Sequence, residues 1–271
     1  MSGSDEVPVT AAGTTRERRT VALTPDAGPA WLRPLIDNVD QIPDAFRRRL
    51  PADVLAMVTA AKSLGRGGRD AAVLVLFSGP ESGTAEGGVP DDADLLLTVR
   101  ASTLRHHAGQ AAFPGGASDP GDDGPVATAL REAREETGID VDRLHPLVTM
   151  ERTFIAPSRF HVVPVLAYSP DPGPVTVVND AETAIVARVP VRAFINPDNR
   201  LMVYRGTLGR RWAGPAFLLN QMLVWGFTGQ VISAVLDVAG WAQPWNTDDI
   251  RELDDAMVLV GDSDGLRGGS R

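Results

Sequence analysis

Three glutamates close together in one segment are the residues of this chain best suited to chemistry. Glu132, Glu135 and Glu136 are spaced i, i+3 and i+4, so in a helix their carboxylates would lie on one face. Like charges at this spacing repel each other, and a divalent cation relieves the repulsion. Ligand sets made only of oxygen favour Mg²⁺ or Mn²⁺ over zinc. The pattern predicts metal-assisted chemistry on a phosphate compound; the alternative is a solvated, salt-bridged helix face.

The residues around the glutamates predict the helix that carries them. Its N-cap candidates are Asp122, Asp123 and Gly124. Pro125 suits the first helical position, and Gly138 suits a left-handed C-terminal residue. The apolar residues at helical spacing, which we expect to face the core, are Val126, Ala129, Leu130 and Ala133. Arg131 precedes Glu135 by four residues, so this pair would hold Glu135 and leave the other two glutamates as the stronger metal ligands.

Residues 131 to 139 resemble the second half of the Nudix box, whose pattern is G-x5-E-x7-R-E-U-x-E-E-x-G-U with U an aliphatic residue. The chain departs from this pattern at the first glutamate, which is replaced by Asp122 when counted from Gly116. The spacer from Asp122 to Arg131 is also one residue longer than the pattern, and Ala133 is small for U. These departures motivate one alternative, a catalytically silent Nudix-fold binding module.

A second motif lies upstream and resembles that of one Nudix subgroup, the coenzyme A diphosphatases. The subgroup pattern is L-L-T-x-R-[SA]-x3-R-x3-G-x3-F-P-G-G, and every specified position matches between Leu96 and Gly116. The resemblance implies hydrolysis of the diphosphate of coenzyme A or acyl-coenzyme A. The products would be adenosine 3′,5′-bisphosphate and 4′-phosphopantetheine, acylated if the substrate was. A Nudix hydrolase of NADH, ADP-ribose or another nucleoside diphosphate derivative is the alternative within this class.

The two motifs also indicate which residues would bind the substrate. Arg100 and Arg105 lie in the subgroup motif, and we expect them to contact phosphate groups. Gly115 and Gly116 lack a Cβ, so their backbone can approach a metal ion or a phosphate closely.

The resemblance assigns the catalytic roles as well. Glu132 and Glu136, assisted by Glu135, would bind Mg²⁺ or Mn²⁺ beside Arg131. The general base of Nudix enzymes often lies on a later loop, and Glu182 is our first candidate. Glu182 is equally explained as part of a turn next to Asn179 and Asp180. The second candidate is Glu151.

Composition limits the remaining function classes. The chain has 271 residues, 43% of them apolar, which is ample for a core. It has no cysteine, which excludes disulfides, thiolate zinc sites and cysteine nucleophiles. The net charge of −9 argues against a nucleic-acid partner. We found no signal-peptide pattern and no run able to span a membrane, so we expect a cytoplasmic enzyme with a small-molecule partner. Both a monomer and a homodimer are compatible with the sequence.

Pattern analysis predicts an α/β fold, a Nudix-type α/β/α sandwich with a mixed β-sheet and a short helical N-terminal extension. The expected divisions are a flexible tail (1–28), a helical extension and linker (29–67), the Nudix hydrolase domain (68–240) and a C-terminal extension (241–271) whose end is disordered. Strands are predicted at 71–77, 95–100, 145–154, 160–168, 184–189, 201–204 and 216–219. Residues 226–238 are predicted to form a second amphipathic helix.

Overall fold

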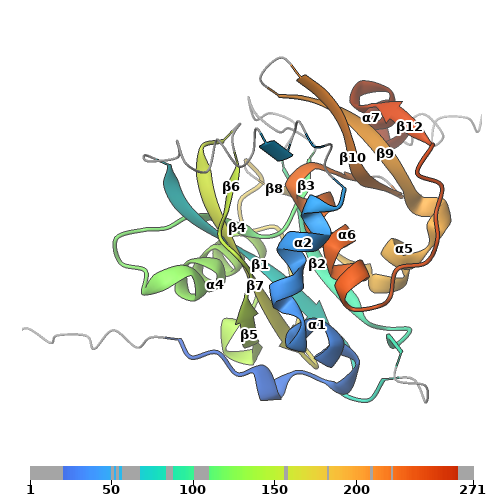
Figure 1. Ribbon diagram of the computed structural model, residues 1–271. Helices are drawn as coiled ribbons and strands as arrows, with labels where there is room; N and C mark the ends of the chain where they lie inside the picture. Colours follow the sequence, from blue (N-terminus) through green and yellow to red (C-terminus); the bar gives the residue numbers. More distant parts are fainter. Residues whose placement is uncertain are drawn as a thin grey trace, which may run out of the picture.

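Two β-sheets with helices around them make up the computed structural model of the protein (Figure 1). It describes residues 21–49, 52, 55–56, 68–83, 88–100, 110–155, 158–181, 183–207, 210–220 and 222–261. The strands are β1 (Arg69–Ser78), β2 (Asp94–Arg100), β3 (Ala111–Ala112), β4 (Gly115–Ala117), β5 (His145–Thr149), β6 (Thr153–Ile155), β7 (Phe160–Ser169), β8 (Thr183–Pro190), β9 (Arg200–Thr207), β10 (Arg210–Leu219), β11 (Met222–Val224) and β12 (Ile250–Glu252). The α-helices are α1 (Arg33–Asp37), α2 (Ile42–Arg47), α4 (Gly124–Thr137), α5 (Val191–Ile195), α6 (Gly226–Val238) and α7 (Leu253–Gly261).

The larger sheet is mixed, as predicted. Its strand order is β3-β2-β1-β7-β5, with β4 paired to β1, β6 to β7 and β8 to β2. The central strands β1 and β7 run parallel along their whole length, while β2 and β4 pair with β1 in the antiparallel direction. The smaller sheet has the order β11-β10-β9-β12. Most predicted strands are confirmed, but the expected strand at 145–154 is interrupted between β5 and β6.

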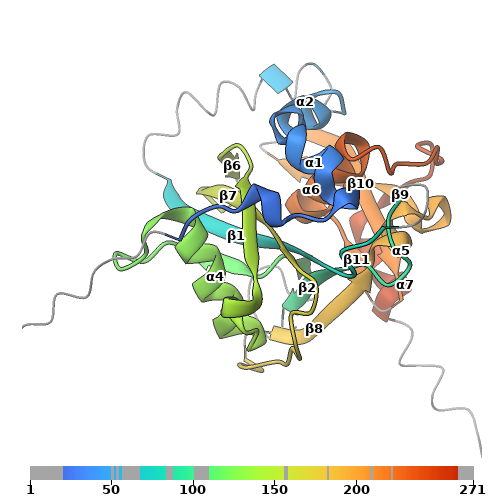
Figure 2. The same cartoon turned by 90° about the horizontal axis from the view of Figure 1, so that it is seen from below.

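Helices cover both faces of the larger sheet (Figure 2). Side chains alternate along β1, so Leu74 and Leu76 pack with Ala129 and Ala133 of α4 on one face. The apolar side chains on the other face of β1, Val75 and Phe77, belong to a cluster that includes residues of α6 and of α1. This arrangement confirms the predicted α/β/α sandwich.

The N-terminal extension forms part of the core. Trp31 is fully buried, and its ring centroid lies 6.2 Å from Phe77, 6.1 Å from Tyr168 and 5.9 Å from Trp241. Its indole Nε1 donates a hydrogen bond to the carbonyl oxygen of Pro80 at 2.9 Å. Because the ring of Trp31 packs against other aromatic rings and its N–H group is hydrogen-bonded, this residue holds the N-terminal segment against the sheet.

Two expected boundaries differ from the observed packing. Residues 24–28 were expected in the flexible tail, but Thr24 donates from its backbone nitrogen to the carbonyl oxygen of Pro146 in β5 at 2.7 Å. The C-terminal extension beginning at residue 241 also joins the domain, because β12 pairs with β9 and Ala256 of α7 is fully buried. The described helices include none that is both long and apolar enough to cross a lipid bilayer.

We predict that Trp31→Ala lowers the free energy of unfolding by about 3–5 kcal/mol, because it leaves a large cavity in a closely packed aromatic cluster. Urea denaturation measures the change. Val178→Ala is the control, since Val178 is 53% exposed and its truncation should change stability by less than about 0.5 kcal/mol. Similar effects of the two substitutions would show that the extension is not part of the core.

Candidate active site

Strand β4 of the larger sheet places two glycines beside helix α4. Gly115 pairs with Val73 and Gly116 pairs with Ala72 of β1. A Cβ on Gly115 would lie 2.4 Å from the backbone oxygen of Ala72 and 2.6 Å from the Cα of Val73, so any side chain there would collide with β1. On Gly116, a Cβ would lie 2.6 Å from the carboxylate of Glu132. Glycine is therefore needed at both positions. The backbone at Gly115 comes close to strand β1, and the backbone at Gly116 comes close to the carboxylate of Glu132.

Helix α4 begins and ends where the sequence predicts. It starts at Gly124 with a proline in its first turn, and it ends before Gly138, which has the left-handed φ of 66°. The predicted apolar positions Val126, Ala129, Leu130 and Ala133 are all buried. Alanines at the centre of this face let the helix axis come close to the sheet, which brings the glutamates to β4.

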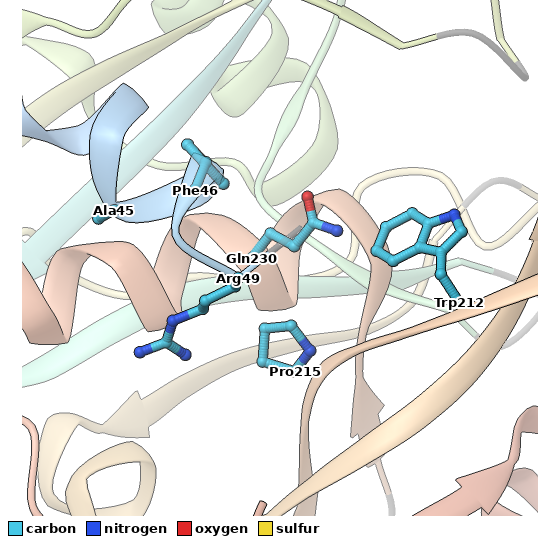
Figure 3. A pocket seen from close by; sticks show the side chains of 6 residues that line it. All are labelled: Ala45, Phe46, Arg49, Trp212, Pro215 and Gln230. Carbon is cyan, nitrogen blue, oxygen red and sulfur yellow. The ribbon is translucent and has the colours of Figure 1, made fainter. Parts of the chain in front are cut away.

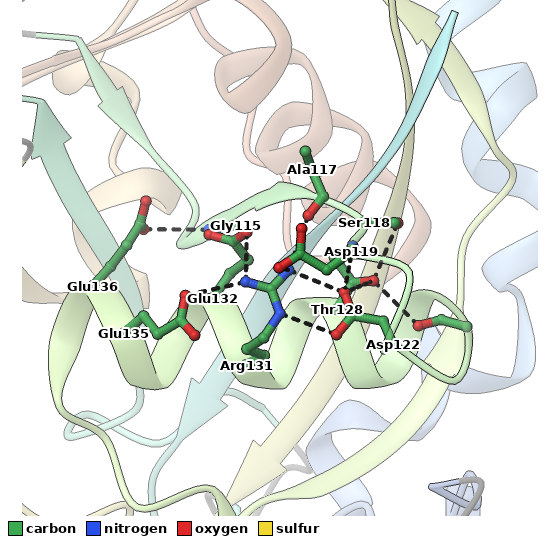
Figure 4. Close-up of polar contacts among 11 residues, drawn as sticks. Gly115, Ala117, Ser118, Asp119, Asp122, Thr128, Arg131, Glu132, Glu135 and Glu136 are labelled. Carbon is green, nitrogen blue, oxygen red and sulfur yellow. Dashed lines mark hydrogen bonds and ion pairs between the residues drawn. The ribbon is translucent and has the colours of Figure 1, made fainter. Parts of the chain in front are cut away.

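Two of the three glutamates extend toward β4 (Figure 4). Glu136 accepts a hydrogen bond from the backbone nitrogen of Gly115 at 3.3 Å. The Glu132 side chain is only 18% exposed, and burial raises the pKa of its carboxyl group, although the hydrogen bond from Arg131 opposes the rise. The side chain of Glu135 is 54% exposed and pairs with Arg131 at 3.0 Å. The predicted Arg131–Glu135 pair is thus confirmed.

Arg131 contacts more carboxylates than the sequence analysis predicts. Its guanidinium also donates to Glu132 at 2.9 Å, to both carboxylate oxygens of Asp122 at 3.0 Å, and to the backbone oxygen of Ala117 at 2.9 Å. Arg131 thus contacts Glu132 as well as Glu135, so the Arg131–Glu135 pair does not by itself set Glu132 apart as the stronger metal ligand. One guanidinium has five donors in a planar fork, and here it joins the loop, the strand and the helix.

The aspartate that replaces the first glutamate of the box holds this arginine. Besides the two bonds from Arg131, its Oδ2 accepts from the backbone nitrogen of Asp119 and from the hydroxyl of Thr128, each at 2.9 Å. The Asp122 side chain is 8% exposed. The hydrogen bonds from Arg131 lower the pKa of Asp122 from its ordinary value of 3.8 to about 2. Asp122 is therefore an ionised anchor for Arg131, whose Nη2 bonds both Asp122 and the β4 residue Ala117.

These residues fit a divalent cation in part. Within the described ranges, no group of three histidine or acidic side chains is assembled for metal binding. The carboxylates of Glu132 and Glu136 both reach the Gly115–Gly116 backbone, which offers further carbonyl oxygens. Hard cations accept such mixed carboxylate and carbonyl oxygens, with water or substrate phosphate completing the set. A positive ion would also offset the burial of Glu132.

The structure describes only some of the remaining predicted site residues. Arg100 ends β2, and its backbone pairs with Thr183 at the start of β8. Arg105 and Glu182 lie outside the described residues. The neighbours of Glu182 form a turn in which Asn179 accepts from the backbone nitrogens of Ala181 at 3.1 Å and Thr183 at 2.9 Å.

Sequence reasoning missed Thr128 as a site residue. Its hydroxyl is fully buried in the loop–helix junction, where it contacts Asp122 and also lies 3.1 Å from the hydroxyl of Ser118. The available signal was a threonine three residues before Arg131 on the same helix face. A threonine in a helix can also bond only to the backbone of its own helix, so that spacing alone does not indicate a role.

Comparison with known proteins agrees with this geometry. The NUDIX domain family model matches residues 67–206, which include β1, β4 and α4. The chain belongs to the Nudix family. It is therefore a hydrolase of the Nudix type that acts on phosphoanhydrides, and Nudix hydrolases generally use divalent metal ions.

Curated Nudix relatives each match about half of the chain. The protein named uncharacterized Nudix hydrolase NudL from Photorhabdus laumondii is 36% identical over 138 residues, covering 51% of this chain and 73% of the relative. The protein of the same name from Yersinia pestis is 36% identical over 140 residues, covering 51% and 68%. Among solved structures, the Nudix hydrolase RenU from M. smegmatis is 26% identical with a TM-score of 0.36, covering 46% of this chain and 73% of that one.

The two adjacent glycines should respond differently to alanine. Gly115→Ala should destabilise this Nudix domain by about 1–3 kcal/mol, because the new methyl group overlaps the backbone of β1. Gly116→Ala should leave stability nearly unchanged and lower activity by roughly 10-fold or more, because only the end of the Glu132 side chain must move. Thermal unfolding and initial hydrolysis rates, measured on both variants, separate the two effects. Equal loss of stability would contradict this difference.

Asp122→Asn should destabilise the protein near neutral pH and have less effect in acid. A carboxyl group whose pKa is lower in the folded than in the unfolded state stabilises the fold above its unfolded pKa. For Asp122 this stabilisation is lost as the pH falls from about 4 to about 2. Urea unfolding of both proteins at several pH values between 7 and 2.5 tests this, and a difference independent of pH would contradict it.

Proposed function

We propose that this Nudix hydrolase cleaves the diphosphate of coenzyme A or acyl-coenzyme A, giving adenosine 3′,5′-bisphosphate and (acyl-)4′-phosphopantetheine. The observation that carries the proposal is the subgroup motif from Leu96 to Gly116, which begins in β2 and ends at the two glycines beside the glutamates. Because the motif starts on β2 and ends at the glycines beside Glu132 and Glu136, we infer that its residues bind the substrate at this site.

In this proposal Glu132 and Glu136 hold Mg²⁺ or Mn²⁺, with Glu135 assisting from the exposed side. A bound divalent cation would stabilise charge on the phosphate oxygens and lower the pKa of a water molecule. Arg131 fixes one oxygen of Glu132 and leaves the other for binding. Gly116 leaves the space in which the Glu132 carboxylate lies.

The substrate carries several negative charges, and so does the protein, at −9 overall. Binding therefore needs positive charge concentrated at the site. We assign this role to Arg100 and Arg105, whose planar guanidinium groups suit phosphate oxygens. Arg100 pairs through its backbone with Thr183, the residue after Glu182, which supports Glu182 as the proposed general base near the phosphate-binding segment.

Product analysis by mass spectrometry tests the proposal. Coenzyme A, acetyl-coenzyme A, NADH and ADP-ribose would each be incubated with the protein in Mg²⁺, in Mn²⁺ and in chelator. We expect adenosine 3′,5′-bisphosphate from the coenzyme A substrates, only with metal, and a loss of roughly 100-fold or more in Glu136→Gln. The control is Glu81→Gln, an exposed carboxylate in the segment that follows β1, which should keep full activity.

Other outcomes select between the alternatives. Cleavage of NADH or ADP-ribose in preference to coenzyme A would retain the chemistry and refute the proposed substrate. Binding without cleavage of any compound, unchanged in Glu136→Gln, would instead indicate a silent binding module. The Asp122–Arg131 pairing argues against that alternative, because the aspartate that departs from the family pattern is an anchor for Arg131.

A further inference from the structure

Arg200 is a buried cation without a carboxylate partner in the described part of the chain. It begins β9 and is 4% exposed. Its Nη2 donates to the hydroxyl of Ser233 in α6 at 2.9 Å, while Nε and Nη1 are buried without a hydrogen-bond partner. Buried polar groups are almost always hydrogen-bonded, and buried charges are usually paired. Two unused donors on one buried guanidinium therefore require an explanation.

Contacts with aromatic rings stabilise the buried guanidinium of Arg200 only in part. The guanidinium carbon lies 4.5 Å from the ring centroid of Trp245 and 5.4 Å from that of Phe217. Contacts with ring faces stabilise a guanidinium. They do not accept hydrogen bonds in its plane, where the N–H groups point. The donors at Nε and Nη1 remain unsatisfied.

A second arginine adds to the positive charge. Arg49 donates to the same Ser233 hydroxyl and to the carboxylate of Asp237. The cluster thus holds two guanidinium groups and one carboxylate. Burial, and then the charge of Arg49, lower the pKa of Arg200 to about 10, so Arg200 remains a cation at neutral pH. One positive charge in the cluster is not balanced.

The cluster can be approached from the surface. Between residues 242 and 248 the side chains are exposed except that of Trp245, which turns inward onto Arg200. On the other side, Arg49 lines a small hollow with Phe46, Trp212 and Gln230 (Figure 3). Trp245 lies in a segment without regular structure, and its ring lies over the guanidinium carbon of Arg200.

We propose that a compact oxyanion of the phosphate class binds between Arg200 and Arg49, at the junction of α6, β9 and the segment that carries Trp245. A phosphate group presents several acceptor oxygens, which match the unused donors of a planar guanidinium. It also balances the charge of the cluster. This site belongs to the α6 side of the larger sheet, whereas α4 and its glutamates lie on the opposite face.

Thermal unfolding of the full chain tests the proposal with inorganic phosphate as the probe. Phosphate is titrated at constant ionic strength against chloride, with chelator present so that metal-bound phosphate at the glutamates does not contribute. We expect a saturable rise in Tm, about 3 °C at ten times the dissociation constant. Arg200→Met should abolish the rise, and in chloride it should be no less stable than the parent, because an unbalanced buried charge is removed.

Matched variants distinguish binding at this cluster from a general effect of phosphate on stability. Arg192→Met is the control, since Arg192 is an exposed arginine paired with Asp91, and it should keep the full response. Arg49→Met should weaken phosphate binding by roughly 10-fold even if Arg200→Met fails to fold. Adenosine monophosphate, titrated in parallel, distinguishes a nucleotide phosphate from the free ion. An unchanged Tm in the parent, or the same response in parent and Arg49→Met, would overturn the proposal and assign a buried water to Arg200.

Discussion

The site depends on one ion-pair network, the guanidinium of Arg131 surrounded by carboxylates of Asp122, Glu132 and Glu135. Carboxylates this close repel each other, and a single arginine with five donors relieves the repulsion while fixing three segments at once. The network joins the loop after β4, the β4 backbone and α4. Without it, nothing in the described contacts would set the orientation of the Glu132 side chain against Gly116.

The network also explains how an aspartate can occupy the position of the first glutamate in the box. Aspartate is one methylene shorter, so its carboxylate stays near the loop backbone. There it accepts bonds from Asp119 and Thr128 as well as from Arg131. The longer spacer and the shorter side chain therefore act together to anchor the arginine, which in turn donates to Glu132.

The two faces of the larger sheet are built differently. On the α4 face, alanines keep the helix close to the sheet, which brings its glutamates to β4. On the other face, large aromatic side chains bring in the N-terminal extension and the C-terminal segment through Trp31 and Trp241. Helix α6 lies between this face and the smaller sheet, so Ser233 is buried although the sequence predicts an amphipathic helix. Burial of its polar positions is what places Ser233 beside Arg200.

The sequence by itself determined the elements whose signals are local. Caps and apolar spacing predicted α4 from its proline to Gly138, and alternation and apolar runs predicted the main strands. The motif also predicted that the glutamates and the backbone of Gly115 and Gly116 would lie together. Tertiary structure alone decided the partners: the pairing of β12 with β9, the burial of Trp31, the contact of Glu132 with Arg131, and the burial of Arg200 with two donor atoms unpaired. The physical reason is that these contacts join residues far apart in sequence, or rotamers chosen by packing, and neither leaves a periodic signal in the chain.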